Sequence, residues 1–292
     1  MAKILSVFSQ KGGVGKTILS VNISAGLALM LSAENSSSPG RVLLVDLDEQ
    51  AHSAIALSGG FDGNQESVEG TPDENIAGLL LHNTRLPTTA VLRESKIPTY
   101  AKGNLDYVPS SREKMAPVSA KLRDAREMGL VRLSQALEPI KHLYDYIVID
   151  NPPGLSYLAL NGLIAASHVL LVTQLETPSL ESMNHGIQTI VTVQRKFNHD
   201  LKFVGIVPNM CDFRRTEQRN LLEALKQRFP GMVLPAIHRR AEITYAISNG
   251  LDIFSFKPAR NKEELESSSM AVHEFIRLLK KLRGAMDGER SA

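Results

Sequence analysis

Short apolar runs alternate with longer segments of helical periodicity along this chain. The runs are rich in Val, Ile and Leu and end at polar or turn residues, as strands do. They predict strands at Ile4–Phe8, Val42–Asp46, Leu105–Val108, Tyr146–Asp150, Val169–Thr173, Phe203–Pro208 and a short one near Ile253–Phe256. Strands that alternate with helices favour an α/β fold: a doubly wound, mostly parallel sheet with helices on both faces.

The segments between the strands complete this outline. A nearly all-apolar helix is predicted from Ile18 to Leu31, and a last helix over about Lys262–Arg283. Gly59–Glu74 is rich in Gly, Asp and Glu, which predicts a mobile loop. Because no segment resembles a domain linker, we expect one domain over residues 1–292, with a disordered tail from about Gly284.

Composition narrows the class of protein. Hydrophobic residues make up 43% and charged residues 22%, which is ordinary for a globular chain of 292 residues. The single cysteine, Cys211, excludes an internal disulfide framework and favours a reducing compartment. No signal-peptide pattern precedes the first strand, and no uncharged apolar run reaches the ~18 residues of a membrane span. We therefore expect a soluble, cytoplasmic protein.

The strongest chemical signal follows the first strand directly. The segment Lys11-Gly12-Gly13-Val14-Gly15-Lys16-Thr17 joins that strand to the first helix, which is the context of a phosphate-binding loop. Glycines let consecutive N–H groups curl around a phosphate, and the helix N-terminus adds its positive end. Lys16 supplies a charge to the β- and γ-phosphates, and Thr17 offers a hydroxyl to Mg²⁺. The loop departs from the usual pattern, because Gln10 stands where a glycine normally begins it and Lys11 is an additional lysine.

Carboxylates end two of the predicted strands. Asp46 and Asp48 are two residues apart, so both can face one site at the end of their strand. Asp150 ends another apolar strand, as the magnesium-binding aspartate of P-loop enzymes does. It is followed by Asn151-Pro152-Pro153-Gly154, in which the prolines stiffen the chain and the glycine permits a pivot.

These motifs, in this order, resemble those of the ParA/MinD family of deviant P-loop ATPases, over about residues 3–283. The resemblance implies the P-loop NTPase fold with ATP and Mg²⁺ as cofactors. It implies that Lys11 reaches across a homodimer interface to the nucleotide of the partner, and that Asp48 orients the attacking water. The segment DLDEQ resembles the family motif DxDPQ, although Glu49 replaces the family proline.

The resemblance also assigns residues to roles. The catalytic residues are Lys11, Lys16 and Asp48. The nucleotide-binding residues are Lys11, Gly12, Gly13, Val14, Gly15, Lys16, Thr17, Ile18 and Asn209, the last against the adenine. The magnesium residues are Thr17, Asp46 and Asp150.

Charge distribution points to a second kind of ligand. From Arg195 onward there are 18 Lys+Arg against 12 Asp+Glu, a net +6 in a chain of net +2. In ParA relatives, arginines at the positions of Arg214 and Arg239 grip the DNA backbone. With the adjacent Arg215 and Arg240, they form the candidate surface for non-specific DNA. His238 replaces a family proline here, and a merely solvated basic face remains the alternative.

Several members of the family fit less well. Iron–sulfur relatives need cysteine pairs, which Cys211 alone cannot supply. A MinD-like membrane ATPase would need an amphipathic last helix free to lie on lipid, and we expect that helix to be packed in the core. We therefore expect a small, Soj-like, nucleoid-associated partition or positioning ATPase, weak until a ParB-like adaptor stimulates it. A membrane partner is unlikely on this view, and a P-loop metabolic ATPase remains the other alternative.

Overall fold

A single seven-stranded sheet organises the computed structural model, which describes residues 2–59, 75–82, 92–97, 104–257 and 262–288, the side chains of 262–265 excepted. The strand order is β3-β4-β2-β5-β1-β6-β7. All neighbours pair in parallel except β3 and β4, which are antiparallel. The predicted doubly wound, mostly parallel sheet is therefore confirmed.

The elements have the following bounds. The strands are β1 (Lys3–Phe8), β2 (Val42–Asp46), β3 (Arg93–Glu94), β4 (Leu105–Val108), β5 (Tyr146–Asp150), β6 (His168–Thr173) and β7 (Lys202–Pro208). The helices are α1 (Lys16–Glu34), α2 (His52–Leu57), α3 (Ile76–His82), α5 (Arg112–Met115), α6 (Val118–Asp124), α7 (Glu127–Leu130), α8 (Arg132–Leu137), α9 (Tyr157–Ile164), α10 (Thr177–Lys196), α11 (Thr216–Arg228), α12 (Ala241–Ser248) and α13 (Lys262–Asp287).

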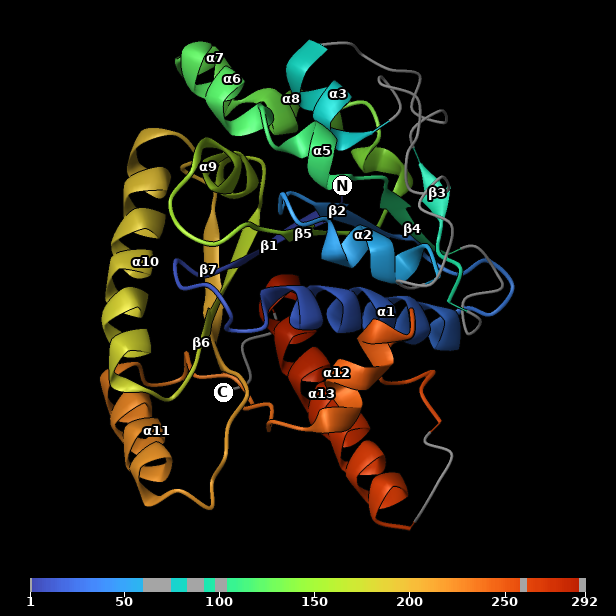
Figure 1. The fold of residues 1–292 in the computed structure, drawn as a ribbon, viewed down its shortest axis with the longest axis vertical. Helices are drawn as coiled ribbons and strands as arrows, with labels where there is room; N and C mark the ends of the chain where they lie inside the picture. Colours follow the sequence, from blue (N-terminus) through green and yellow to red (C-terminus); the bar gives the residue numbers. More distant parts are fainter. Residues whose placement is uncertain (1, 60–74, 83–91, 98–103, 258–261, 289–292) are drawn as a thin grey trace.

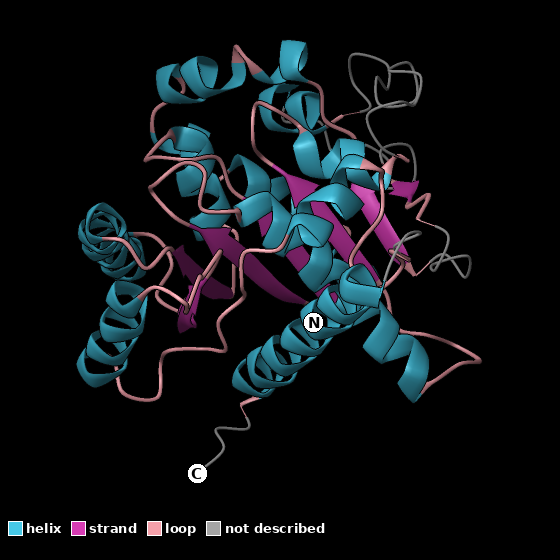
Figure 2. Ribbon diagram, turned by 60° about the horizontal axis from the view of Figure 1, so that its bottom comes forward, coloured by secondary structure: helices cyan, strands magenta, loops and turns pink. Residues whose placement is uncertain are grey.

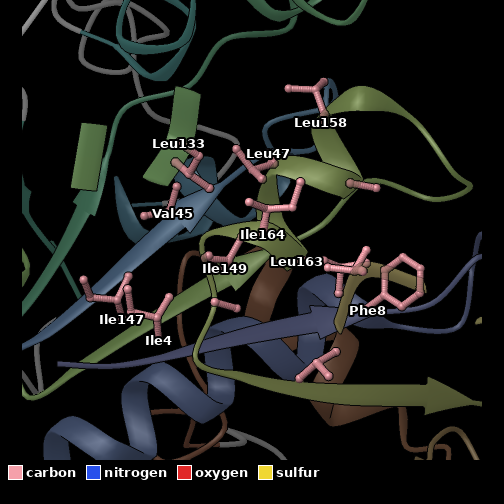
Figure 3. Close-up of a cluster of buried hydrophobic side chains, with 14 of the residues drawn as sticks. Ile4, Phe8, Val45, Leu47, Leu133, Ile147, Ile149, Leu158, Leu163 and Ile164 are labelled. Carbon is pink, nitrogen blue, oxygen red and sulfur yellow. The ribbon is translucent and has the colours of Figure 1, made fainter. Parts of the chain in front are cut away.

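The two faces of the sheet carry separate hydrophobic clusters, because side chains alternate along each strand. On β2, Leu43 and Val45 belong to the cluster that α3 and α5–α11 cover, whereas Leu44 belongs to the cluster under α1, α2, α12 and α13. Figure 1 shows α1, α12 and α13 on one side of the sheet and α3 and α5–α9 on the other, and Figure 2 shows the strands lying between helices. Figure 3 shows the first cluster, with Phe8 and Ile149 among its members.

Helix α1 is long and apolar enough to cross a membrane by length and composition alone. In the fold it is a core helix, since most of its residues are buried between the sheet and α13. The packing against α13 is close, because a Cβ on Gly26 would collide with the side chain of Leu279.

Helix α13 is the last core helix, as the sequence predicted. Its apolar positions are all buried: Ala271, Phe275, Leu278, Leu279 and Leu282. Its end is tied to the amino ends of the strands, where Asp287 pairs with Lys3 and accepts a hydrogen bond from the hydroxyl of Tyr146. Arg283 pairs with Glu34 at the end of α1.

Two expectations about these elements need correction, and one strand was missed. Residues Ile253–Phe256 form a turn instead of a strand, because the Asp252 carboxylate accepts hydrogen bonds from the amides of Phe254 and Ser255. The chain does not fray at Gly284, because α13 continues to Asp287 and buries Met286. The short edge strand β3 was not predicted, since its two residues are charged and give no apolar signal. The predicted loop after Gly59 lies outside the described residues.

Candidate nucleotide-binding site and basic surface

The sheet register brings the candidate carboxylates to one edge. Asp46 is paired with Asp150 across β2 and β5, and Val7 of β1 is paired with Asp150 on the other side. The loop that follows β1 therefore starts beside both carboxylates. This is the carboxyl edge of the parallel strands, where such sheets bind ligands.

The glycine-rich loop between β1 and α1 has the backbone geometry of a phosphate cradle. Gly13 and Gly15 have positive φ angles of 74° and 83°, which side chains with a Cβ rarely adopt. A Cβ on Gly13 would meet no other atom within 4 Å, so the space beside this glycine is open. Val14 turns into the core and anchors the loop.

Lys16 and Asp150 form the buried electrostatic centre of this edge. Lys16 is 6% exposed, and its Nζ lies 3.4 Å from the carbonyl oxygen of Lys11. Burial lowers the pKa of Lys16, although the charges of Asp150 and Asp48 oppose this change. Burial, with the nearby charge of Asp46, raises the pKa of Asp150 to about 8, and the nearby hydroxyl of Thr17 opposes this rise.

Asp46 organises the loop after β2. Its Oδ1 accepts a hydrogen bond from the amide of Asp48 at 2.9 Å, and its Oδ2 accepts from the amides of Ser53 and Ala54 at 3.0 and 3.1 Å. Burial raises the pKa of Asp46 to about 6, against the lowering effect of these hydrogen bonds. Asp46 therefore fixes the position of Asp48 and the start of α2, which is consistent with indirect support of the magnesium region.

The loop that presents Asp48 is strained at one residue. Ala51 has φ 55° and ψ 25°, a left-handed conformation that costs roughly 1 kcal/mol for a residue with a Cβ. Asp48 itself is half-buried, and its Oδ1 accepts a hydrogen bond from the amide of Gln50 at 3.0 Å. The predicted catalytic carboxylate thus lies beside the glycine loop, close enough to affect the pKa values of Lys16 and Asp150.

The Pro-Pro-Gly segment rests directly on the glycine-rich loop. The amide of Gly154 donates to the carbonyl oxygen of Gln10 at 2.9 Å, and a Cβ on Gly12 would lie 3.6 Å from Pro153. Asn151 is fully buried and donates to the Ser6 hydroxyl at 2.8 Å. A movement of either loop must therefore displace the other.

Asn209 braces the glycine loop from the end of β7. Its Nδ2 donates to the carbonyl oxygen of Val14 at 2.8 Å, and it is 2% exposed. Gln174 makes a similar contact with the carbonyl oxygen of Gly13 at 3.4 Å. Contact of Asn209 with an adenine stays a prediction, since the amide donor is engaged by the loop itself.

Lys11 is held by its own subunit. Its Nζ donates to Oγ of Ser179 at 2.7 Å and lies 3.2 Å from Oε2 of Glu176, at the start of α10. Gln10 adds a second link to this helix, because its Nε2 donates to the Thr189 hydroxyl at 2.9 Å. The lysine that sets this loop apart is therefore docked on α10.

The four arginines of the candidate DNA surface fall into two kinds. Within the described residues, Arg215 and Arg239 are exposed and make no side-chain hydrogen bond or ion pair. Arg214 is exposed but forms a two-pronged pair with the Asp212 carboxylate at 2.8 and 2.9 Å. The segments that carry these arginines lie side by side, because the amide of Arg239 donates to the carbonyl oxygen of Cys211 at 2.9 Å.

Arg240 differs from the other three, since it is largely buried. Its Nη2 donates to Oε1 of Glu274 at 2.7 Å, and Glu274 is 3% exposed on α13. The other oxygen of Glu274 accepts a hydrogen bond from the amide of His238 at 3.0 Å. Arg240 thus has a structural partner, and a role in DNA binding remains a prediction that this contact does not favour.

Sequence reasoning missed the polar residues that support the site. Ser20, Gln174, Glu176 and Ser179 lie outside the motifs, and three of them come from segments more than 150 residues after the loop. Only Ser20 had a usable signal, because it lies three residues after Thr17 and so shares its helix face.

The arrangement fits a nucleoside triphosphate with Mg²⁺. The open glycine turn and the Lys16 ammonium suit phosphate oxygens, and Thr17 and Asp150 suit a hard divalent cation. Oδ2 of Asp150 is buried and has no hydrogen-bond partner among the described residues, so one carboxylate oxygen is left for such a cation or its water shell.

Comparison with known proteins places the chain in a family. A family model described as an AAA domain matches residues 2–203. The sporulation initiation inhibitor protein Soj of Bacillus subtilis is 32% identical over 267 residues, 91% of this chain and 95% of that protein. The chromosome partitioning protein ParA of Myxococcus xanthus is 35% identical over 238 residues, 81% of this chain and 75% of that protein.

Solved structures agree on the fold. The cobyrinic acid a,c-diamide synthase of Mycobacterium smegmatis, with bound ADP and magnesium, has a TM-score of 0.67 and 29% identity, covering 85% of this chain and 91% of the other. The ATP complex of a Cyanothece McdA variant has a TM-score of 0.71 over 94% of this chain and 96% of that one, and at 18% identity it supports the fold alone. The chain belongs to the ParA/MinD family of P-loop ATPases, whose cofactors are ATP and Mg²⁺.

Proposed function

We propose that this protein is an ATP-dependent partition or positioning ATPase of the cytoplasm, associated with the nucleoid. In its ATP-bound state it forms a homodimer that binds non-specific DNA, and a ParB-like adaptor stimulates hydrolysis, which releases the DNA. The proposal rests on Lys11, the additional lysine at the start of the glycine loop, which accompanies a complete phosphate-binding motif. The partition proteins among the relatives support the cellular role.

Different residues of the chain have different roles in ATP hydrolysis. Lys16 and the loop amides bind the phosphates, and Asp48 holds the attacking water in line. Thr17 and Asp150 hold the cation, which neutralises charge on the phosphate oxygens when bound. Lys11 supplies a further positive charge to the γ-phosphate in the partner subunit, as an arginine finger does elsewhere.

The docked position of Lys11 supports slow turnover without a partner. To reach the other subunit, its Nζ must leave both Glu176 and Ser179. Breaking these bonds opposes the contact in trans, so the complete site forms only part of the time. A partner that stabilises the dimer raises that fraction and with it the rate of hydrolysis.

The DNA proposal rests on Arg214, Arg215 and Arg239, which are exposed on neighbouring segments. Phosphate contacts from such arginines bind DNA of any sequence, with an affinity that falls steeply as salt rises. The membrane alternative lacks comparable support, because the apolar face of α13 is buried in the core.

A metabolic ATPase is the second candidate, because the structure that is 29% identical to this chain is described as a synthase. This function predicts ATP hydrolysis that requires an organic substrate and does not change when DNA is added. The same experiment separates the two functions.

The test is a gel shift on random-sequence DNA with ATP, ADP or no nucleotide. We expect ATP alone to favour the shift in wild type, Lys16→Ala to abolish that preference, and Arg239→Ala to weaken binding in every state. Arg123→Ala, at an exposed arginine of α6, is the matched control and should bind as wild type does. Binding of anionic liposomes instead of DNA would support the membrane alternative, and binding of neither would favour the metabolic one.

A further inference from the structure

Ser20 is a fully buried hydroxyl beside the nucleotide site to which no motif gives a role. It lies on α1, one turn beyond Thr17. Its Oγ donates to Oδ1 of Asp150 at 3.1 Å, which joins two segments 130 residues apart. A buried serine that bonds to a strand-end carboxylate needs a physical explanation.

The neighbouring serine on the same helix shows the ordinary behaviour. Ser24 is also fully buried, and its Oγ donates back to the carbonyl oxygen of Ser20, four residues earlier, at 2.8 Å. This is the usual way for a serine inside a helix to satisfy its hydroxyl. Ser20 instead donates its hydrogen bond to the Asp150 carboxylate, outside its own helix.

The contact makes the two oxygens of Asp150 unequal. Oδ1 accepts the hydrogen bond of Ser20, whereas Oδ2 is buried with no partner in the described part of the chain. A carboxylate with one oxygen fixed cannot turn freely about its Cβ–Cγ bond. Asp46 is less available than Asp150 as a ligand, because its two oxygens already accept hydrogen bonds from three backbone amides.

We propose that Ser20 is a positioning residue, which holds the Asp150 carboxylate so that Oδ2 faces the magnesium ion of bound nucleotide. The proposal depends on the family's use of ATP and Mg²⁺ and not on the DNA or partner roles. Hydrogen-bond partners of metal-binding groups have effects of this kind, and removing one typically weakens metal affinity about 10- to 100-fold.

The test measures how much Mg²⁺ strengthens nucleotide binding. The Kd of a non-hydrolysable ATP analogue is determined by calorimetry with Mg²⁺ and with EDTA. The Kd in EDTA divided by the Kd with Mg²⁺ is the magnesium ratio, which is large when the cation strengthens binding. We expect Ser20→Ala to reduce this ratio about 10-fold while leaving the Kd in EDTA unchanged. Ser24→Ala, the matched control, should keep the wild-type ratio.

A second pair of variants covers the case in which Ser20→Ala does not fold. Ser20→Thr and Ser20→Val have nearly the same shape, and only the threonine keeps a hydroxyl. The threonine variant should keep a higher magnesium ratio than the valine variant. The proposal would be overturned if the threonine and valine variants had equal magnesium ratios. It would also be overturned if Ser20→Ala and Ser24→Ala lowered the magnesium ratio equally. Failure of the analogue to bind wild type in any buffer would instead contradict ATP binding itself.

Discussion

The nucleotide edge and the basic surface show opposite ways of placing charged groups. At the nucleotide edge, Lys16, Asp46 and Asp150 are buried and positioned by backbone amides, hydroxyls and one another. On the basic surface, Arg215 and Arg239 project into solvent, and Arg214 is paired with the partly exposed Asp212. Buried charged groups have fixed positions and shifted pKa values. Exposed charged side chains can change their conformation, and together they set the net charge of the surface.

This difference indicates what each region can do. A preorganised site suits a ligand of one shape, such as a triphosphate with its cation, because the groups need not reorganise on binding. An exposed set of arginines suits a repeating polyanion, since each phosphate contact adds similarly and no single geometry is required.

The largest effect is the pH dependence of stability at the nucleotide edge. The pKa of Asp150 is raised from 3.8 to about 8, so between these values the folded protein binds a proton that the unfolded chain has lost. The stability from this group is full below about pH 4 and is lost as pH rises through about 8, with a slope of up to about 1.4 kcal/mol per pH unit. Thermal unfolding of nucleotide-free protein should show this slope, and Asp150→Asn should reduce it.

The basic surface should behave in the opposite way. Arg214 holds the pKa of Asp212 at about 2, so the contribution of this pair is present above pH 4 and is lost only as pH falls toward 2. Asp212→Asn should therefore leave the pH dependence of the melting temperature unchanged between pH 5 and pH 8. A change in this pH dependence as large as that caused by Asp150→Asn would break the contrast.

Glu274→Ala tests the one buried charge next to the basic surface. The variant leaves Arg240 largely buried without its partner, and removing one member of such a pair typically costs about 3–5 kcal/mol. Urea denaturation should show this loss in the free energy of unfolding. Glu181→Ala, at an exposed acid of α10, should lie within about 0.5 kcal/mol of wild type.

Asp212→Asn should tighten DNA binding. It releases the guanidinium of Arg214 and removes a negative charge from the surface, while the asparagine oxygen can still accept the amide of Arg214. One additional phosphate contact should raise affinity several-fold and steepen the salt dependence by about 0.9 in log–log slope. Glu217→Gln on α11 removes the same charge without freeing an arginine. If the salt dependence of DNA affinity also steepens in that variant, the cause is the net charge of the surface and not an additional contact from Arg214.

The smallest effect concerns the strained residue of the Asp48 loop. Ala51→Gly and Ala54→Gly each remove a buried methyl group, but only Ala51→Gly also relieves a left-handed position. Ala51→Gly should therefore be less destabilising than Ala54→Gly, which lies inside α2, by about 1 kcal/mol. The urea midpoint should accordingly fall further in the Ala54→Gly variant.

The sequence predicted the fold well where structure follows from local patterns. The central strands were found because apolar runs such as Tyr146–Asp150 are buried on both faces, and the glycine loop because its residues are contiguous. The turn at Ile253–Phe256 was wrongly predicted as a strand, because hydrogen bonds from the backbone amides of Phe254 and Ser255 to the Asp252 carboxylate override an apolar run.

The site was predicted only in part, for a different physical reason. Motifs name the residues that face a ligand, but the groups that hold them come from distant segments, as Ser179 does for Lys11. Likewise, charge counting could not distinguish Arg239, which is exposed, from Arg240, which pairs with a buried glutamate. Such pairings depend on tertiary packing that one sequence does not display.

The position of α13 has a consequence for how the protein is made. Helix α1 ends at Glu34, whereas the helix that packs on it spans Lys262–Asp287. During translation, the surface of α1 that contacts α13 therefore stays uncovered until more than 200 further residues have been synthesised. A ribosome that stalls between the two helices would release a chain with this apolar surface exposed.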